Sequence, residues 1–351
     1  MYPINLNYKM PAEWVTHMRT FISWPVQASM CYPEDFDTVC FGYAEIIEAI
    51  AEFEPVTVVV NSVDVVESEI LVHLFKNERI EGLTIEHNDA WLRDNGPTFL
   101  VSDMGDVAGV NWQFNAWGGK YAPWDLDNQV ASQIMKHVGL KRYDAPLVME
   151  GGSFHVDGEG TLLTTEQCLL NPNRNPELTR EQIEAELKKF LNINKVVWLK
   201  NGLDGDETDG HVDNIACFAA PGKILVQVCD DPKDANYTIT QENLTILRGE
   251  TDALGRKFEI VPIQQPPILF DNDTRLTLSY LNFYFVNRGI ILPVFGGKAR
   301  DTDQLAVQAL EKLFPERRIR TVNGMAIIRE GGNVHCTTQQ MPSKSESNLG
   351  L

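Results

Sequence analysis

The sequence predicts a mixed α/β fold made of five similar units. Five segments have the pattern of two strands joined by a tight turn, and they begin at residues 96, 152, 210, 279 and 332. Their starts lie 56, 58, 69 and 53 residues apart, and a near-constant period indicates repetition of one structural unit. If the units close in a ring, corresponding strand ends of all five meet near its axis.

Each element is expected from a local pattern. The hairpin turns combine glycine with Asp, Asn or Pro, and the turn of the last hairpin is placed at residues 341–342. Helices are expected over residues 36–53, 127–138, 179–191 and 302–314, the third beginning with a capping-box spacing of Thr179 and Gln182. Single strands are expected at residues 56–60, 195–199 and 258–261.

Composition limits the classes of partner. The chain has 351 residues, 43% of them hydrophobic, so it can bury a sizeable core. Its formal net charge of −19 disfavours nucleic acid and anionic membranes and favours a small cationic ligand. The six cysteines include no pair with CxxC spacing, and neither a signal peptide nor a membrane-spanning run is visible. We therefore expect a cytoplasmic protein with reduced thiols.

Cys336 is the candidate nucleophile. It follows the glycine pair at residues 331–332, and paired glycines allow a ligand to approach the backbone closely. A thiol attacks as the thiolate, whose usual pKa of about 8.5 calls for a nearby base or a bound cation. Because a free cysteine is more often a small buried residue, the assignment depends on the segments that would meet it.

His211 and Asp213 form the expected proton-transfer pair. They are two residues apart, which predicts that both lie on one face of a strand. An imidazole beside a carboxylate can protonate a leaving group. The same letters recur at residues 155–157, where we expect a structural role. The two pairs also suit a metal site completed by Glu150 and Cys336, but the letters suit a metal-free site as well, and we expect the latter.

Asp94 and Glu150 are candidate binding groups for a guanidinium. Asp94 precedes the turn at residues 95–97, and Glu150 precedes the glycine pair at residues 151–152. Carboxylates hold a guanidinium through paired hydrogen bonds in one plane. The ordinary alternatives are a surface ion pair between Asp94 and Arg93, and a turn position facing solvent for Glu150.

These segments resemble the agmatine deiminases, members of the guanidino-group-modifying superfamily that includes arginine deiminases and amidinotransferases. The resemblance covers nearly the whole chain, from Met10-Pro11-Ala12-Glu13-Trp14 to Gly332-Asn333-Val334-His335-Cys336. Between them lie, in order, the matching segments 88–97, 115–119, 150–160, 169–176 and 210–213. So many long motifs in one order are specific, whereas each motif alone is weak.

The resemblance implies a fold and a reaction. The fold is a pseudo-symmetric, five-bladed α/β propeller, which agrees with the five repeats. The reaction is the hydrolysis of agmatine to N-carbamoylputrescine and ammonia through a covalent intermediate on Cys336, with His211 as the general acid and base. We expect neither a metal nor a cofactor, and the partner is the small cationic substrate.

The resemblance also implies how the substrate is held. Asp94 and Asp213 correspond to the carboxylates that bind the guanidinium. Glu150 corresponds to an acid that pairs with the histidine or with the substrate. Trp91 and Glu207 fall near the aliphatic and amine end of the substrate.

Two departures from the family pattern bear on specificity. Glu330 stands where many relatives have a third glycine, and Asp209 where asparagine is common, so both add negative charge near the expected site. One alternative is an arginine or peptidyl-arginine deiminase of the same superfamily, which needs a basic residue for a carboxylate or an open cleft for a peptide. The other is a non-catalytic protein that binds polyamines or guanidines, which the intact set of Cys336, His211 and Asp94 disfavours.

The domain organisation is expected to be simple. Residues 1–341 are predicted to form a single catalytic domain, and the polar residues 342–351 are predicted to be a disordered tail. We also expect the protein to form a homo-oligomer.

Overall fold

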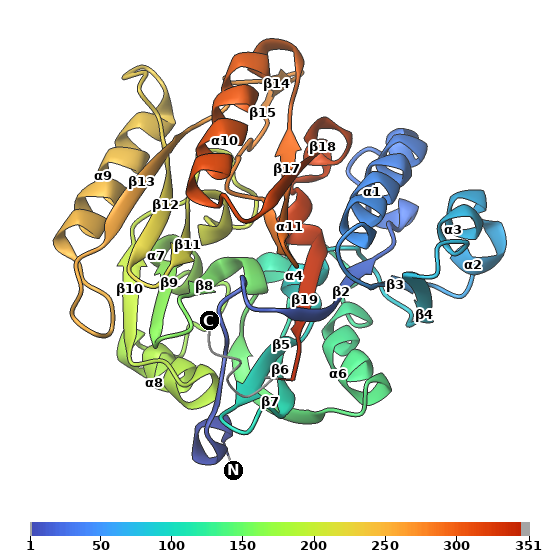
Figure 1. Ribbon diagram of the computed structural model, residues 1–351, viewed down its shortest axis with the longest axis horizontal. Coiled ribbons are helices and arrows are strands. Elements are labelled where there is room, and N and C mark those ends of the chain that lie inside the picture. The colour runs from blue at the N-terminus through green and yellow to red at the C-terminus, as the bar shows by residue number, and fades with distance from the viewer. Residues whose placement is uncertain (1, 345–351) are drawn as a thin grey trace.

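The computed structural model describes residues 2–344 of the chain and has a mixed α/β fold (Figure 1). Five of its sheets share one pattern, in which two antiparallel strands are followed by a third strand parallel to the second. Four of these sheets are consecutive in the sequence: β5 (Thr98–Ser102), β6 (Val107–Gln113) and β7 (Lys141–Val148); β8 (Phe154–Val156), β9 (Thr161–Thr165) and β10 (Lys195–Leu199); β11 (Ala216–Ala220), β12 (Lys223–Val228) and β13 (Glu259–Gln264); β16 (Tyr284–Val286), β17 (Gly289–Val294) and β18 (Arg318–Asn323).

The fifth sheet joins the two ends of the chain. Its strands are β19 (Thr338–Pro342), β2 (His17–Ser23), β3 (Val56–Val60) and β4 (Ile80–Thr84). The predicted turn at residues 341–342 is wrong, because β19 pairs antiparallel with the N-terminal strand β2, with Gln339 opposite Phe21. Pro342 therefore belongs to a strand, and residues 345–351 of the predicted tail lie outside the described residues.

The remaining elements are short strands, short α-helices and 3₁₀-helices. Strand β1 (Tyr8–Lys9) extends the first sheet, and β14 (Phe270–Asp271) pairs with β15 (Thr274–Arg275). The short α-helices are α2 (Asp64–Glu67), α3 (Glu69–Leu74), α4 (Leu92–Asn95), α5 (Ala116–Gly119), α7 (Glu166–Leu169) and α11 (Val334–Thr337). The 3₁₀-helices are η1 (Pro3–Leu6), η2 (Gln27–Ser29), η3 (Pro33–Asp35), η4 (Gly151–Ser153), η5 (Val212–Asn214), η6 (Gly297–Ala299), η7 (Gly324–Ala326) and η8 (Ile328–Glu330).

A long helix connects the two parallel strands of each repeated sheet, as a parallel connection requires. These helices are α1 (Phe36–Ala51), α6 (Asp127–His137), α8 (Arg180–Leu191), α9 (Ala235–Gly249) and α10 (Arg300–Leu313). The four predicted helices are present with ends shifted by at most two residues, and the capping box of Thr179 and Gln182 is confirmed. Helix α9 was not predicted, because its inner face carries the buried polar residues Asn236, Thr240 and Asn243.

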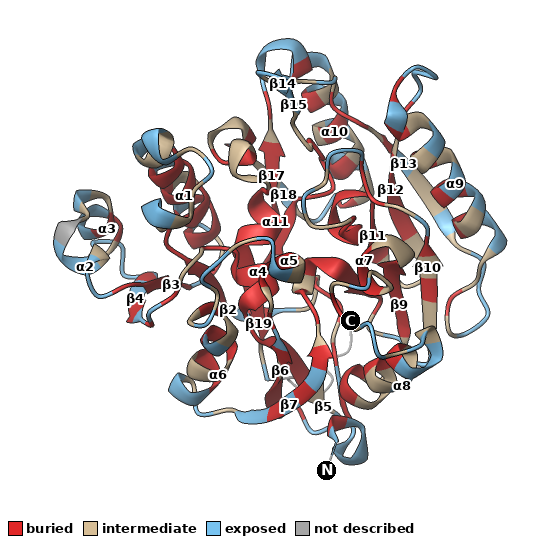
Figure 2. Cartoon of the chain, turned by 180° about the vertical axis from the view of Figure 1, so that it is seen from behind, coloured by how far each residue is buried: buried red, intermediate tan, exposed pale blue. Residues whose placement is uncertain are grey.

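Apolar side chains fix each helix on its sheet. In α1, Ile46, Ile47 and Ile50 are buried in one cluster with Val56 and Val58 of β3. Complete burial of such a side chain contributes roughly 1.5–3 kcal/mol. Figure 2 shows the same division over the molecule, with exposed residues on the outer faces of the helices and buried ones on the strands and on α4 and α11. None of the described helices has both the length and the apolar character that a membrane crossing requires.

Short helical turns meet at the centre of the fold (Figure 1). Helix α4 contacts both α11 and η4, and η4 contacts η5. The prediction that His211 and Asp213 lie on a strand is wrong, because Asp213 is in η5 and the following strand begins only at Ala216. The backbone turns immediately before them, where Asp209 has a φ of 65°. Cys336 likewise lies in α11 rather than on a strand.

Candidate active site

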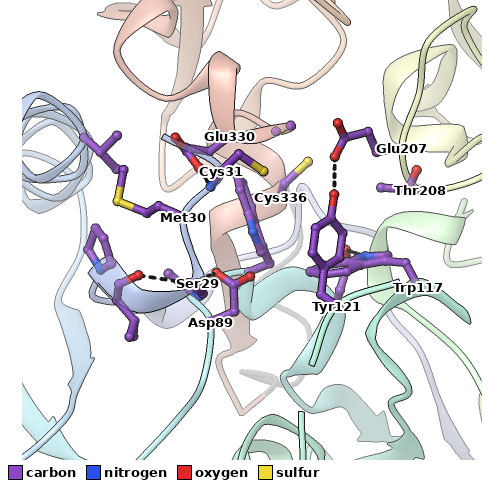
Figure 3. Close-up of a pocket in the computed structure, with 18 of the residues that line it drawn as sticks. Ser29, Met30, Cys31, Asp89, Trp117, Tyr121, Glu207, Thr208, Glu330 and Cys336 are labelled. Atoms are coloured by element: carbon purple, nitrogen blue, oxygen red, sulfur yellow. Dashed lines mark hydrogen bonds between the residues drawn. The ribbon is translucent and has the colours of Figure 1, made fainter. Parts of the chain in front are cut away.

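A pocket of about 700 Å³, counting its open mouth, is lined by residues from both ends and the middle of the chain (Figure 3). Four of the seven predicted site residues line it: Cys336, Asp94, Trp91 and Glu207. The other three, His211, Asp213 and Glu150, lie fully buried around the first two. The structure therefore brings the predicted set together.

The Cys336 thiol is 6% exposed and has two polar neighbours. The Nδ2 group of Asn282 donates to Sγ at 3.1 Å, and Sγ lies 3.5 Å from Oδ2 of Asp213. Burial raises the pKa of this thiol well above its usual value, and the charges of Asp213 and Asp94 add to the rise. The raised pKa favours the thiol form, and a cation bound beside the sulfur would favour the thiolate.

The His211 imidazole lies between two carboxylates without contacting either closely. Its Nδ1 is 3.8 Å from Oδ2 of Asp94, and its Nε2 is 3.6 Å from Oε2 of Glu150. Burial alone would lower its pKa, but Asp94, Cys168 and Glu150 outweigh burial and raise the pKa well above the usual value. The ring is therefore an imidazolium that can give up a proton.

The carboxylates of Asp94 and Asp213 are held in fixed positions. Asp94 accepts hydrogen bonds from the Trp117 indole at Oδ2 and from the Gly152 amide at Oδ1, both at 2.9 Å. Asp213 accepts one from Nδ1 of His335 at 2.9 Å, while its Oδ1 has no partner among the described residues. Burial raises the pKa of Asp94, whereas His335 and His211 overcome burial and lower that of Asp213.

Arg93 is not the surface partner of Asp94 that the ordinary alternative assumes. It is 2% exposed, and its guanidinium donates to the His335 carbonyl at 3.2 Å and to Gln340 at 2.9 Å. Its Nη1 atom forms an ion pair with Oε1 of Glu13 at 3.4 Å. Asp94 is therefore free to face the pocket.

Glu150 is fully buried and paired with a cation. The Nε group of Arg174 donates to its Oε1 at 2.7 Å. Burial would raise its pKa, but His211 and Arg174 hold the pKa below the usual value. Donor atoms of Glu150, Cys168 and His211 lie within 4.8 Å of one another, a spacing that a metal ion could use. The adjacent guanidinium already balances the carboxylate, so these residues do not suit a further cation.

Gly152 allows the site residues to converge. A Cβ atom at this position would lie 2.6 Å from Nδ1 of His211, 2.9 Å from Oδ2 of Asp213 and 3.0 Å from Oδ1 of Asp94. Real Cβ contacts are longer, so any side chain here would push these groups apart. The glycine pair that follows Glu150 is thus required for close approach.

Trp91 and Glu207 both lie on the wall of the pocket. The Trp91 ring packs so closely on Gly332 that a Cβ there would lie 2.4 Å from Cζ3. Glu207 is exposed at the mouth and accepts a hydrogen bond from the Tyr121 hydroxyl at 2.5 Å (Figure 3). An alkyl chain beside Trp91 could therefore end at the Glu207 carboxylate.

The two acids that depart from the family pattern behave differently. Asp209 forms ion pairs with Lys120 and Arg174, each at 2.7 Å, so its charge is balanced and the expectation of added charge is wrong for this residue. Glu330 lines the pocket and accepts hydrogen bonds from the amides of Cys31 and Tyr32. Only Glu330 thus adds an acid to the pocket wall.

Several supporting residues were not identified from the sequence. Asn282 contacts the thiol, Arg174 balances Glu150, and His335 bridges Asp213 to Glu13. Arg174, His335 and Glu13 lie inside motifs of the resemblance, which was the available signal. Asn282 lies at the start of the fourth hairpin and had no such signal.

The fold, with its buried cysteine, histidine and carboxylates, places the chain in a class of deiminases. It belongs to the Porphyromonas-type peptidyl-arginine deiminase family, and the family pattern matches residues 9–342. A relative from Legionella pneumophila is 46% identical over 340 residues, which cover 97% of this chain and 96% of that protein.

Two further comparisons are with agmatine deiminases. That of Pseudomonas syringae pv. tomato is 42% identical over 363 residues, covering 96% of both chains. The structure of agmatine deiminase of Enterococcus faecalis superposes with a TM-score of 0.90 at 35% identity and 98% coverage of both chains.

Proposed function

We propose that this protein is an agmatine deiminase, which hydrolyses agmatine to N-carbamoylputrescine and ammonia. One observation carries the choice of substrate. Four carboxylates line the pocket, those of Asp89, Asp94, Glu207 and Glu330, and none of its described lining residues is Lys, Arg or His. A substrate with a cation at each end suits this wall, whereas the carboxylate of arginine would be buried without a partner.

The first half of the reaction forms the covalent intermediate. Asp94 and Asp213 hold the guanidinium, and its positive charge favours the thiolate form of Cys336, so the thiol proton leaves to solvent, where the released ammonia takes it up. The sulfur attacks the guanidinium carbon and forms a C–S bond. His211 then donates its proton to the departing nitrogen, the C–N bond breaks, and ammonia leaves.

The second half releases the product. A water molecule takes the place of ammonia, and the neutral His211, beside Glu150, accepts one of its protons. The water oxygen forms a bond to the carbon, the C–S bond breaks, and the thiolate is restored. The water oxygen becomes the ureido oxygen of N-carbamoylputrescine once its second proton passes to the Cys336 sulfur, which restores the thiol beside the imidazolium of His211.

The experiment combines product analysis with trapping of the intermediate. Purified protein given agmatine should release one equivalent of ammonia for each N-carbamoylputrescine, and acid quenching should leave an amidino adduct on the peptide that contains Cys336. Turnover should survive exhaustive chelation, because no step requires a metal. An adduct on another residue, or activity restored only by a metal, would contradict this mechanism.

We further propose the architecture and setting of the enzyme. The shared strand pattern of the five sheets supports a pseudo-symmetric five-bladed propeller formed by residues 1–341 as one domain. All six cysteines are free, which supports a cytoplasmic location. The net charge of −19 supports the absence of nucleic acid and membrane partners. Light scattering would test the proposed homo-oligomer.

A further inference from the structure

The pocket contains more acceptor groups for cations than agmatine can use. Beyond Asp94 at the reactive end, the carboxylates of Glu207, Glu330 and Asp89 line the same wall. Figure 3 shows Glu207 on one side of Cys336, and Glu330 and Asp89 on the other. Agmatine has a single ammonium group to offer them.

Nearby bases are engaged elsewhere. Arg329, next to Glu330, forms ion pairs with Asp35 and Asp271. Lys120 pairs with Asp209. Within residues 2–344, neither Glu207 nor Glu330 nor Asp89 forms an ion pair with a side chain of the protein, so a ligand is the available source of positive charge.

Backbone amides fix Glu330, and the Glu207 carboxylate approaches the residue that follows it. Oε2 of Glu330 accepts a hydrogen bond from the Cys31 amide at 2.7 Å, and its Oε1 accepts one from the Tyr32 amide at 3.2 Å. The Glu207 carboxylate lies 3.5 Å from where a Cβ of the neighbouring Gly331 would be. Two ammonium groups separated by a short alkyl chain could therefore each reach one of these acids.

An unpartnered hydroxyl marks the same region independently. Tyr43 of α1 is 2% exposed and lines the pocket, and its hydroxyl forms no hydrogen bond within the described part of the chain. Burial raises the pKa of Tyr43, and the charges of Asp89, Cys336 and Glu330 add to the rise. The hydroxyl is not among the polar atoms that are shut off from solvent, so it is accessible from the pocket, where a ligand can supply its partner.

Asp89 completes this part of the wall. Its Oδ1 accepts hydrogen bonds from the Ser29 hydroxyl at 3.1 Å and from the Ala90 amide at 2.7 Å. Burial raises its pKa to about 7, and Glu330 adds to the rise. This carboxyl is therefore partly protonated at neutral pH, and an ammonium bound beside it would favour the carboxylate.

We propose that Glu330, Asp89 and Tyr43 bind a second ammonium group, so that the pocket accepts guanidino-polyamines in which an aminoalkyl chain extends the amine of agmatine. This inference rests on the proposed deiminase function and narrows its substrate class. The guanidinium still reacts at Cys336, the secondary ammonium lies near Glu207, and the terminal ammonium lies near Glu330.

The test compares agmatine with its N-(3-aminopropyl) derivative through kcat/KM for ammonia release. The wild type should use this aminopropyl derivative at least as efficiently as agmatine. Glu330→Gln keeps the size of the side chain and removes its charge. It should therefore lower the ratio of kcat/KM for the aminopropyl derivative to kcat/KM for agmatine about tenfold. Tyr43→Phe should lower that ratio several-fold, and it removes only a hydroxyl without a partner. Asp103→Asn, which removes a charge from an exposed turn, should leave the ratio unchanged.

The outcomes separate the two proposals. Failure to release ammonia from agmatine would overturn the proposed function and this inference with it. If agmatine is turned over but kcat/KM for the aminopropyl derivative is about a hundredth of that for agmatine or less, the deiminase function would be retained and the second ammonium site would be overturned. If Glu330→Gln lowers both efficiencies equally, Glu330 serves only to position residues 31–32, whose amides it accepts hydrogen bonds from. That result would also overturn the second ammonium site.

Discussion

At the residue scale, the proposed chemistry depends on one buried thiol, Cys336, whose ionisation the substrate would favour. The Cys336 thiol has a raised pKa because it is buried beside Asp213 and Asp94. In the proposed mechanism, the same two carboxylates attract the guanidinium, whose charge stabilises the thiolate. Binding of the substrate and activation of the nucleophile are therefore coupled in this mechanism.

Cys336→Ser should abolish turnover while agmatine still binds, because a serine hydroxyl forms no anion at neutral pH in this setting. Ammonia release should fall by about four orders of magnitude or more, and calorimetry should still detect agmatine. Cys31→Ser is the matched control, since that exposed thiol also lines the pocket and has no assigned role in the reaction. Full activity of the Cys336 variant would exclude the assigned nucleophile.

His211→Ala and Asp213→Asn should each reduce kcat/KM by about a hundredfold or more, since one removes the proton donor and the other a charge at the guanidinium. The Asp213 substitution also removes the ion pair with His335, so its melting temperature must be measured in parallel. Near-normal rates in either variant would make that residue structural.

At the element scale, one glycine permits the convergence of three side chains. Gly152→Ala would place a Cβ atom within 3.0 Å of His211, Asp213 and Asp94. We expect a loss of kcat/KM of about a hundredfold with a cooperative melting transition retained. Gly249→Ala is the control, because a Cβ there meets nothing within 4 Å. An active Gly152 variant would show that the spacing of these groups is not critical.

The segment that leads to Asp94 is tied to α6 by a buried acid. Oδ1 of Asp127 accepts hydrogen bonds from the amides of Asn88 and Asp89 at 2.7 and 3.0 Å. Burial raises the pKa of Asp127 to about 7, above its unfolded value of about 3.9. The folded state therefore holds an extra proton between these values, and stability falls as pH rises through this window.

Asp127→Asn should remove the loss of stability at rising pH, because its amide oxygen can still accept both hydrogen bonds and the side chain carries no charge. The melting temperature of the variant, relative to the wild type, should increase as pH rises from about 4 to 8. The exposed Asp125 gives the control, since Asp125→Asn should show no such trend. A difference in melting temperature between the variant and the wild type that does not change with pH would rule out a proton on the buried Asp127.

Local patterns in the sequence were sufficient for most elements, and together with the resemblance they indicated seven candidate residues that the structure brings together. They were insufficient wherever distant segments meet or polar groups are buried. Strand β19 pairs with β2 across almost the whole chain, which no local pattern encodes. Helix α9 buries Asn236 and Asn243, whose side chains accept hydrogen bonds from the backbone, so it lacks an apolar stripe. Asn282 reaches the thiol through a long-range contact of the same kind.

At the scale of the whole molecule, the acidic charge and the pocket favour the same kind of substrate. A formal charge of −19 attracts small cations, and the pocket wall presents four carboxylates without a described basic residue. The repeated sheets place α4, η4, η5 and α11 together at the centre, where Asp94 and Asp213 lie near the Cys336 thiol.

The ratio of kcat/KM for agmatine to that for free arginine, measured on one preparation, tests the central claim most directly. Both substrates present the same guanidinium to Cys336, and they differ by the carboxylate that the acidic wall would leave unpaired. We expect agmatine to be preferred by at least about a thousandfold. The preference should weaken in Glu207→Gln, which removes the carboxylate proposed for the far ammonium. Comparable efficiencies for arginine and agmatine would contradict the assignment of the substrate.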